Sequence, residues 1–221
     1  MGGVGRVLGP FVAVLDYGSG NLRSAERALQ RAGARVLVTP SVEAAADADG
    51  LVVPGVGAYA ACMAGIDAIS AGPMIAARVE AGRAVLGICV GMQVMFDFGV
   101  EHGVRTPGLG LLPGGVTRLA APRVPHMGWN TVTVDTGFTE FESLPGERFY
   151  FVHSYAAHDE IGGARLAYAD HGGRFLAAVS RGSLTVTQFH PEKSGDAGAR
   201  LLRNWVAALS VSTHTDGAGN G

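Results

Sequence analysis

The chain has 221 residues, of which 48% are hydrophobic, and 17 basic side chains nearly balance 19 acidic ones. A chain of this length and composition can bury a full hydrophobic core, so one compact domain is expected. The net charge of -2 gives no basic excess for binding nucleic acid. No segment approaches the roughly 20 consecutive apolar residues that span a bilayer, so the expected partners are small molecules or proteins and not a membrane.

The N-terminus and the cysteine content favour a cytoplasmic location. Residues 1–6 lack the charged head and long apolar stretch of a signal peptide. The chain has two cysteines, Cys62 and Cys89, too few to indicate a disulfide framework. We therefore expect a protein of the reducing cytoplasm.

Short apolar runs alternate with segments of helical period in the first half of the chain. This pattern predicts a largely parallel sheet covered by helices. The predicted strands are residues 11–15, 35–38, 50–53 and 84–88, and the predicted helices are residues 21–32 and 73–82.

Beyond about residue 110 the pattern becomes rich in β segments. The expected β segments are 129–134, 148–152 and 176–189, and a closing helix is expected over 197–209. This order predicts an antiparallel segment added to a mostly parallel sheet, within an α/β fold. The expected organisation is an N-terminal extension over 1–10, one domain over 11–209 and a short polar tail over 210–221 that is disordered.

Cys89 follows a predicted strand and has a glycine two residues away on each side, in Gly87-Ile88-Cys89-Val90-Gly91. Glycines at these positions permit a tight strand-to-helix turn with the sulfur at its apex, where open α/β sheets bind ligands. The free amides at the start of the next helix would favour the thiolate, and the amide of Val90 could donate to an oxyanion. The same pattern also fits a buried core cysteine between two packing glycines.

His190 and Glu192 supply what a cysteine nucleophile needs: a base, and a group that orients the base. Side chains two residues apart in an extended chain face the same way, so the two could touch. Taken alone, the sequence His-Pro-Glu also fits a surface turn. Together with Cys89 it favours a catalytic triad.

Gly18-Ser19-Gly20-Asn21 suggests a nucleotide-binding turn. The third glycine of a Gly-x-Gly-x-x-Gly fingerprint would fall at position 23, which is occupied by Arg23. A dinucleotide site is therefore rejected.

Residues 87–93 and 188–192 together resemble the signature of class I (triad) glutamine amidotransferases, which have a flavodoxin-like fold. Residues 16–22, 125–130 and 150–155 narrow the resemblance to the glutaminase subunits of imidazole glycerol phosphate synthase. The similarity runs from about residue 11 to residue 208. It implies that Cys89 attacks the side-chain amide of glutamine, releases ammonia and leaves a thioester that water converts to glutamate.

The resemblance assigns roles to further residues. His190 would move the proton and Glu192 would stabilise the imidazolium. The oxyanion donors would be the amide of Val90 and the turn at Val56 and Gly57. The peptide of this turn would flip when the partner protein is loaded with its substrate. Glutamine would be bound by Gly57, Gln93, Ser154 and Tyr155. No cofactor and no metal is implied.

The resemblance also implies a partner. A separate (β/α)8-barrel cyclase subunit would form a heterodimer with this chain, receive the ammonia through a channel and make imidazole glycerol phosphate and AICAR in histidine biosynthesis. The residues that would face or sense it are Asn21, Lys193, Met127 and Trp129. Lys193 is the single lysine among 17 basic residues. Its presence beside the triad indicates that a compact ammonium group is needed at this position. Without the resemblance, Met127 and Trp129 would be assigned to the core.

Three other functions remain open. A glutaminase of another type, such as that of anthranilate synthase, would share the triad but not residues 16–22 and 125–130. An inactive scaffold would tolerate loss of the triad. A peptide-cleaving cysteine hydrolase would act without a partner.

Overall fold

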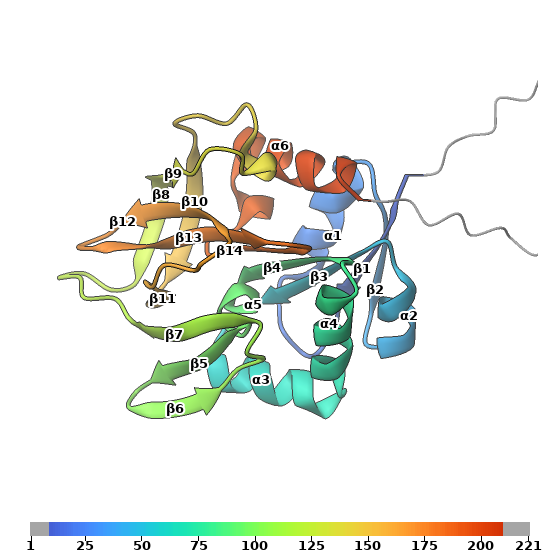
Figure 1. The fold of residues 1–221 in the computed structure, drawn as a ribbon, viewed down its shortest axis with the longest axis horizontal. Helices are drawn as coiled ribbons and strands as arrows, with labels where there is room; N and C mark the ends of the chain where they lie inside the picture. The colour runs from blue at the N-terminus through green and yellow to red at the C-terminus, as the bar shows by residue number, and fades with distance from the viewer. Residues whose placement is uncertain (1–8, 210–221) are drawn as a thin grey trace, which may run out of the picture.

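The computed structural model describes residues 9–209, and its centre is an eight-stranded mixed sheet (Figure 1). The strand order is β2-β1-β3-β4-β14-β13-β12-β9. Five neighbouring strands from β2 to β14 run parallel, and the remaining three are antiparallel. The strands are β1 (Phe11–Leu15), β2 (Arg35–Thr39), β3 (Gly50–Gly55), β4 (Ala84–Cys89), β9 (Thr133–Val134), β12 (Arg165–Asp170), β13 (Arg174–Arg181) and β14 (Leu184–Thr187). The expected α/β architecture with an added antiparallel segment is confirmed.

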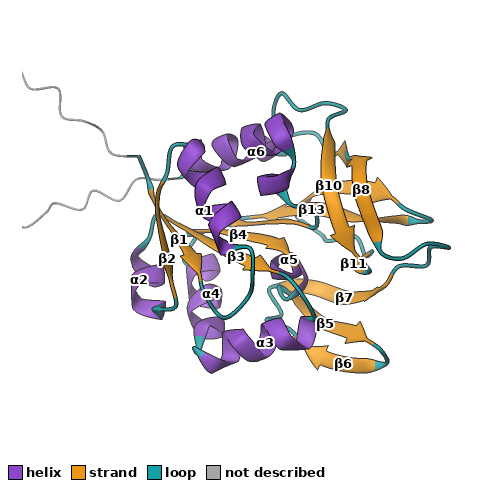
Figure 2. Ribbon diagram, turned by 180° about the vertical axis from the view of Figure 1, so that it is seen from behind, coloured by secondary structure: helices purple, strands orange, loops and turns teal. Residues whose placement is uncertain are grey.

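Helices cover both faces of this sheet, α1 and α6 on one side and α2, α3 and α4 on the other (Figures 1 and 2). The helical elements are α1 (Leu22–Arg31), α2 (Val42–Asp47), α3 (Tyr59–Ala68), α4 (Ala71–Glu80), α5 (Val90–Gln93), α6 (Gly195–Ala207) and the 3-10 turns η1 (Thr139–Phe141) and η2 (Pro191–Lys193). The central strands β1, β3 and β4 lie between the two helical layers, and most of their side chains are fully buried. The parallel strands therefore form a rigid base, and their carboxyl ends meet at one edge.

Two smaller β structures lie beyond that edge, a β8-β10 pair and a sheet of order β11-β7-β5-β6 (Figure 2). Their strands are β5 (Phe96–Glu101), β6 (Val104–Pro107), β7 (Leu112–Arg118), β8 (His126–Thr131), β10 (Arg148–His153) and β11 (Tyr155–Ala157). The β-rich region thus begins at Phe96, earlier than the expected residue 110. Both smaller structures face the end of β4.

Two of the expected β segments are divided in the structure. Residues 129–134 fall in β8 and β9, which belong to different sheets because β8 pairs with β10 whereas β9 pairs with β12. Residues 176–189 cover most of the β13-β14 hairpin, which begins at Arg174 and turns at Gly182 with a φ of 61°. The expected extension 1–10 lies outside the described residues except for Gly9 and Pro10, and the expected disordered tail 210–221 lies wholly outside them.

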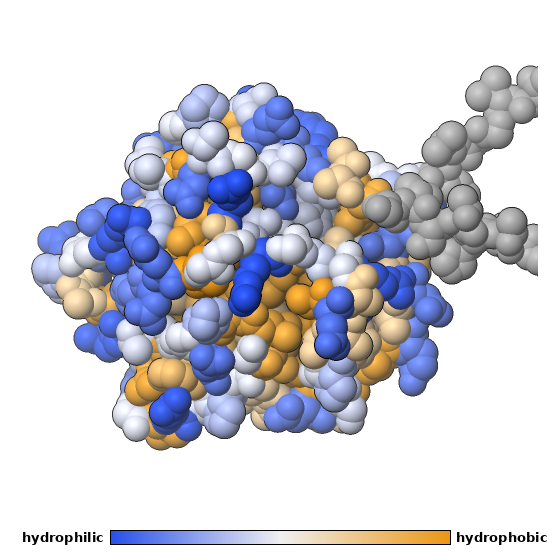
Figure 3. Space-filling view, in the orientation of Figure 1, coloured by the Kyte–Doolittle hydropathy of each residue, from blue (hydrophilic) through white to orange (hydrophobic). Residues whose placement is uncertain are grey.

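The described residues contain no single helix long and apolar enough to cross a membrane. The helices α3 and α4 meet the length and composition test only as a pair, and they are bent by 91° at their junction. On the face drawn in Figure 3, hydrophobic surface occurs in patches separated by hydrophilic residues. The large hydrophobic side chains exposed in the described part of the chain are Leu37, Val104, Met127 and Trp129.

Candidate active site

Cys89 ends β4 in a strained turn, with φ of 58° and ψ of -113°. A positive φ at a residue with a Cβ is uncommon and costs about 1–3 kcal/mol, so the surrounding structure must impose it. A Cβ on Gly87 would lie 2.7 Å from the Gly91 carbonyl oxygen, and one on Gly91 would lie 1.9 Å from the Val53 carbonyl oxygen. The two glycines therefore let the turn close on itself and pack against β3. The tight strand-to-helix turn expected from these glycines is confirmed.

The helix after Cys89 has only four residues, Val90–Gln93, before the chain enters β5. Its dipole is correspondingly small, but its N-terminal amides are still free of helical partners. Polar groups from other elements also lie near the sulfur. Sγ lies 4.0 Å from the Val152 carbonyl oxygen and 3.7 Å from Nε2 of Gln188.

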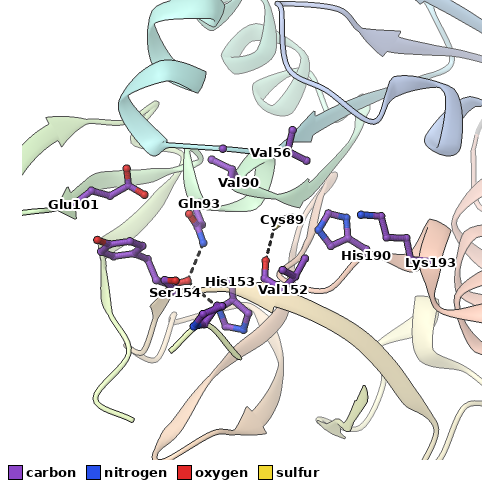
Figure 4. Close-up of a pocket in the computed structure, with 13 residues that line it drawn as sticks. Val56, Cys89, Val90, Gln93, Glu101, Val152, His153, Ser154, His190 and Lys193 are labelled. Carbon is purple, nitrogen blue, oxygen red and sulfur yellow. Dashed lines mark hydrogen bonds between the residues drawn. The ribbon is translucent and has the colours of Figure 1, made fainter. Parts of the chain in front are cut away.

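Cys89 also lines a cavity of about 420 Å³ at the carboxyl ends of the strands (Figure 4). This position distinguishes it from a cysteine enclosed by the core, although only 4% of the residue is exposed. The lining residues are Val56, Gly57, Cys89, Val90, Gln93, Glu101, Pro125, Val152, His153, Ser154, Tyr155, His190 and Lys193. Every residue expected to bind glutamine or an oxyanion is among them.

His190 and Glu192 touch, with 2.7 Å between Nδ1 and Oε1. The expected contact is present, but the expected extended geometry is wrong, because Glu192 lies in the 3-10 turn η2. The same carboxylate oxygen accepts a 2.6 Å hydrogen bond from Nδ2 of Asn21, which precedes α1 in a left-handed conformation. Asn21 therefore contacts the orienting group of the triad and does not line the cavity.

The electrostatics of His190 favour its charged form. Burial by itself lowers the pKa of this imidazole, but hydrogen bonding and charge interactions with Cys89 and Glu192 outweigh burial and raise the pKa to about 9. At neutral pH the imidazole between a sulfur and a carboxylate thus holds its second proton. Such a group can stabilise a thiolate and later donate a proton to a leaving amine.

Both backbone polar groups of Val56 have partners in the structure. The Val56 amide donates a 3.0 Å hydrogen bond to Oγ of Ser19, and the Val56 carbonyl accepts a 3.5 Å contact from Sγ of Cys62. In addition, the Tyr17 hydroxyl donates to the Pro54 carbonyl. The Val56 donor expected to serve an oxyanion is therefore engaged by Ser19.

The far wall of the cavity is built around Gln93 and the Ser154-Tyr155 segment (Figure 4). Nε2 of Gln93 donates 2.9 Å hydrogen bonds both to the Tyr155 carbonyl and to Oε1 of Gln188. Both amide hydrogens of Gln93 are thus used within the protein. Its oxygen remains as the acceptor for a ligand amine.

Of the residues expected at a partner surface, Met127, Trp129 and Lys193 are exposed, whereas Asn21 is half-buried. Met127 is 63% and Trp129 is 47% exposed, so their assignment to the core is wrong. Both lie on β8, and the Trp129 ring packs edge-on against Tyr150 with centroids 5.9 Å apart. Lys193 is exposed beside His190 at the cavity (Figure 4). Within residues 9–209 no group of three or more His, Cys, Asp or Glu side chains is arranged to hold a metal ion.

Comparison with known proteins decides the family. The model of the family described as glutamine amidotransferase class-I matches residues 13–209. The imidazole glycerol phosphate synthase subunit HisH of Mycobacterium bovis is 62% identical over 201 residues, covering 90% of this chain and 98% of the relative. The HisH subunit of Corynebacterium glutamicum is 54% identical over 204 residues, covering 88% and 97%. The chain belongs to the class I glutamine amidotransferases, within the HisH family.

Solved structures support the same fold for this HisH family member. A structure described as a glutamine amidotransferase superposes with a TM-score of 0.72 at 24% identity and covers 90% of this chain and 99% of its own. PurLQS from Thermotoga maritima gives a TM-score of 0.70 at 21% identity, covering 90% and 98%. At these identities the similarity shows the class I amidotransferase fold and nothing finer.

Three polar residues in or behind the cavity wall were not singled out by sequence reasoning. Gln188, His126 and His153 are all buried, and they are linked to the cavity wall by hydrogen bonds. Each lies within a motif that carried the resemblance, but no spacing rule assigns chemistry to a glutamine or a histidine at those places. Their buried polar character becomes visible only when the fold brings them together.

Proposed function

We propose that this HisH family member hydrolyses glutamine to glutamate and ammonia, with Cys89 as nucleophile. The observation that carries the proposal is the geometry around one cavity. A strained cysteine at a strand end shares that cavity with an imidazole whose other nitrogen contacts a carboxylate, Glu192. Membership of the class I amidotransferases selects glutamine as the substrate over a peptide.

The proposed reaction has two halves. The Cys89 thiolate attacks the side-chain carbonyl carbon of glutamine, and the oxyanion is held by the Val90 amide together with the turn at Val56 and Gly57. Protonated His190 gives a proton to the departing ammonia, which leaves a glutamyl thioester. His190, now neutral, takes a proton from water as the water attacks the thioester, and glutamate is released.

Substrate binding is assigned to the opposite wall of the cavity. The oxygen of Gln93 is proposed to accept a hydrogen bond from the amino group of glutamine. Ser154, Tyr155 and Gly57 are proposed to hold the remainder of the amino-acid head. These residues lie around the cavity and leave the Cys89 end to the side-chain amide.

The ammonia is proposed to pass to a separate cyclase subunit with a (β/α)8-barrel fold, which makes imidazole glycerol phosphate and AICAR in histidine biosynthesis. The relatives are named as subunits of this synthase, which supports the assignment. Exposed Met127 and Trp129, with Lys193 and Asn21, are proposed to form or sense the interface. Residues 11–209 are proposed as the amidotransferase domain of a cytoplasmic heterodimer.

Partner control is proposed to act on the turn at Val56. Its amide is bonded to Ser19, so it can serve an oxyanion only after the peptide reorients. Gly57, with a φ of 93°, allows such a change at low cost because it lacks a Cβ. Glutamine hydrolysis is therefore expected to be slow until the cyclase subunit, with its ribosyl substrate bound, shifts this peptide.

The function is tested by measuring glutamate formation from glutamine with the purified chain, its cyclase subunit and the ribosyl substrate of the cyclase. We expect rapid turnover only in the complete mixture. Cys89→Ala should abolish it while the complex still forms. Turnover that persists in Cys89→Ala would remove this cysteine as nucleophile, and cleavage of peptides by the chain alone would favour a peptide hydrolase.

A further inference from the structure

Gln188 is a fully buried amide beside the nucleophile, with 0% of the residue exposed. It follows β14, whose last residue Thr187 is in register with Ile88 of β4, so Gln188 is level with Cys89. Gln188 does not line the cavity, and it approaches the sulfur from inside the protein. A polar side chain is buried at this depth only when its hydrogen bonds are made.

The direction of the Gln188 amide is determined by its neighbours. A backbone carbonyl can only accept, so the atom of Gln93 that faces the Tyr155 carbonyl must be its nitrogen. That nitrogen also faces Gln188, so Gln188 must present its oxygen there. The Gln188 nitrogen is then left to donate to Sγ of Cys89, at 3.7 Å.

The Tyr155 carbonyl is itself held by a chain of side chains from β8 and β10. His153 Nδ1 lies 3.0 Å from this carbonyl, and His153 Nε2 lies 3.0 Å from His126 Nδ1. Nδ2 of Asn130 lies 3.3 Å from Nε2 of His126 and donates to it. Each ring is thus neutral, with its proton on Nδ1, and all the bonds point toward the carbonyl.

Burial keeps these two rings neutral. It lowers the pKa of His126 to about 4 and the pKa of His153 to about 3. The Tyr155 carbonyl therefore receives hydrogen bonds from His153 on one side and from Gln93 on the other. Its position, and with it the direction of the Gln188 amide, is fixed at neutral pH.

We propose that Gln188 stabilises the thiolate of Cys89 by donating an N–H hydrogen bond to the sulfur, with its direction set by the Tyr155 carbonyl through Gln93. This deepens the proposed function, because it rests on Cys89 reacting as a thiolate. A hydrogen bond to a charged acceptor is stronger than one to its neutral form, so the bond favours the thiolate over the thiol. The four-residue helix α5 has only a small dipole, so a side-chain donor adds to what its amides supply.

The test uses Gln188→Met, which keeps the volume and removes the amide, and Gln188→Glu, which keeps an oxygen for Gln93 but directs a carboxylate oxygen at the sulfur. The rate at which iodoacetamide alkylates Cys89 is followed from pH 5 to pH 10 and is separated from alkylation of Cys62 by peptide mass spectrometry. We expect the alkylation midpoint to move to higher pH in both variants. At pH 7 the rate should fall about 10-fold to 100-fold, as for loss of one hydrogen bond to a charged group.

Steady-state kinetics with the cyclase subunit provide a second measurement. In Gln188→Glu, which keeps the oxygen that accepts from Gln93, kcat should fall with little change in KM for glutamine. The matched control is Thr187→Val, which removes a fully buried neighbouring hydroxyl that donates to the Phe189 carbonyl. We expect Thr187→Val to lower the melting temperature without moving the alkylation midpoint.

The outcomes separate this inference from the proposed function. If the wild-type chain hydrolyses glutamine but both Gln188 variants keep its alkylation midpoint and kcat, Gln188 has no role toward the sulfur. If Thr187→Val moves the midpoint as far as Gln188→Met, the effect is loss of packing and the inference is overturned. If the wild-type complex makes no glutamate, the proposed function itself fails.

Discussion

The Val56 amide donates a 3.0 Å hydrogen bond to the hydroxyl of Ser19, across 37 positions of the chain. This bond ties the turn after β3 to the loop after β1. It also occupies a donor that the reaction is proposed to need. While this hydrogen bond to Ser19 is made, the Val56 amide is not free to donate to an oxyanion.

Ser19→Ala removes this hydrogen bond, and we expect the variant to form glutamate faster in the absence of the cyclase. One neutral hydrogen bond contributes about 1 kcal/mol, so the expected increase in basal kcat is about 5-fold. Ser41→Ala is the matched control, because the Ser41 hydroxyl also accepts a backbone N–H, from Ala44, but caps the distant helix α2. An unchanged basal rate in Ser19→Ala would show that this bond does not limit the turn.

Asn21→Gly tests the second contact of the triad carboxylate. Glycine accepts the left-handed backbone of Asn21, with a φ of 70°, but removes the 2.6 Å hydrogen bond to Glu192. A hydrogen bond to a charged group contributes about 1.5–3 kcal/mol, so kcat with the partner should fall at least about 10-fold. The free energy of unfolding should fall by no more than the same amount. Equal kcat in the variant and the wild type would mean that His190 alone fixes Glu192.

Lys193→Arg tests whether the ammonium group matters at the cavity. Lys193 is exposed beside His190, so the substitution should change the free energy of unfolding by no more than about 0.5 kcal/mol. A planar guanidinium cannot take the place of a compact ammonium, so we expect weaker stimulation of glutamate formation by the loaded cyclase. Stimulation equal to wild type would show that charge alone suffices.

Stability should depend on pH through the two buried histidines. The pKa of His126 is lowered to about 4 and that of His153 to about 3, from 6.5. Below pH 6.5 the unfolded chain binds protons that the folded chain does not, so stability present at pH 7 is lost as pH falls toward 4. Each ring contributes about 3 kcal/mol to this loss.

Urea unfolding at pH 7 and at pH 4.5 measures this dependence. His126→Gln should reduce the change in the free energy of unfolding by about 1.4 kcal/mol per pH unit, the effect of one proton. His158→Gln is the control, because His158 is exposed. A wild-type stability that does not change across this window would contradict the neutral histidine chain.

The parallel half of the fold could be predicted because its strands are continuous apolar runs. The predicted strand 11–15 has the bounds of β1, and the predicted strand 84–88 lacks only the last residue of β4. The helices α2 and α3 escaped prediction. Both are rich in alanine, and the apolar residues of α3 are not confined to one face.

The part of the candidate site that could be predicted is the part whose chemistry follows from residue type. A cysteine, a histidine and a glutamate at strand ends indicate a triad from their chemistry, and Cys89, His190 and Glu192 are brought together here. Contacts that depend on the path of the backbone were not predicted. The bond from Ser19 to Val56 joins two loops whose proximity follows from the β1-β3 pairing, and no local pattern encodes it.

The most direct test of the central claim, that Cys89 attacks the side-chain carbon of glutamine, is covalent labelling with a glutamine analogue that carries a diazo ketone in place of the amide. The label should appear on Cys89 and not on Cys62 when digested complex is measured by mass spectrometry. Excess glutamine should prevent labelling, and His190→Ala should slow it. Inactivation of the complex with the label on another residue, and Cys89 unmodified, would contradict the account.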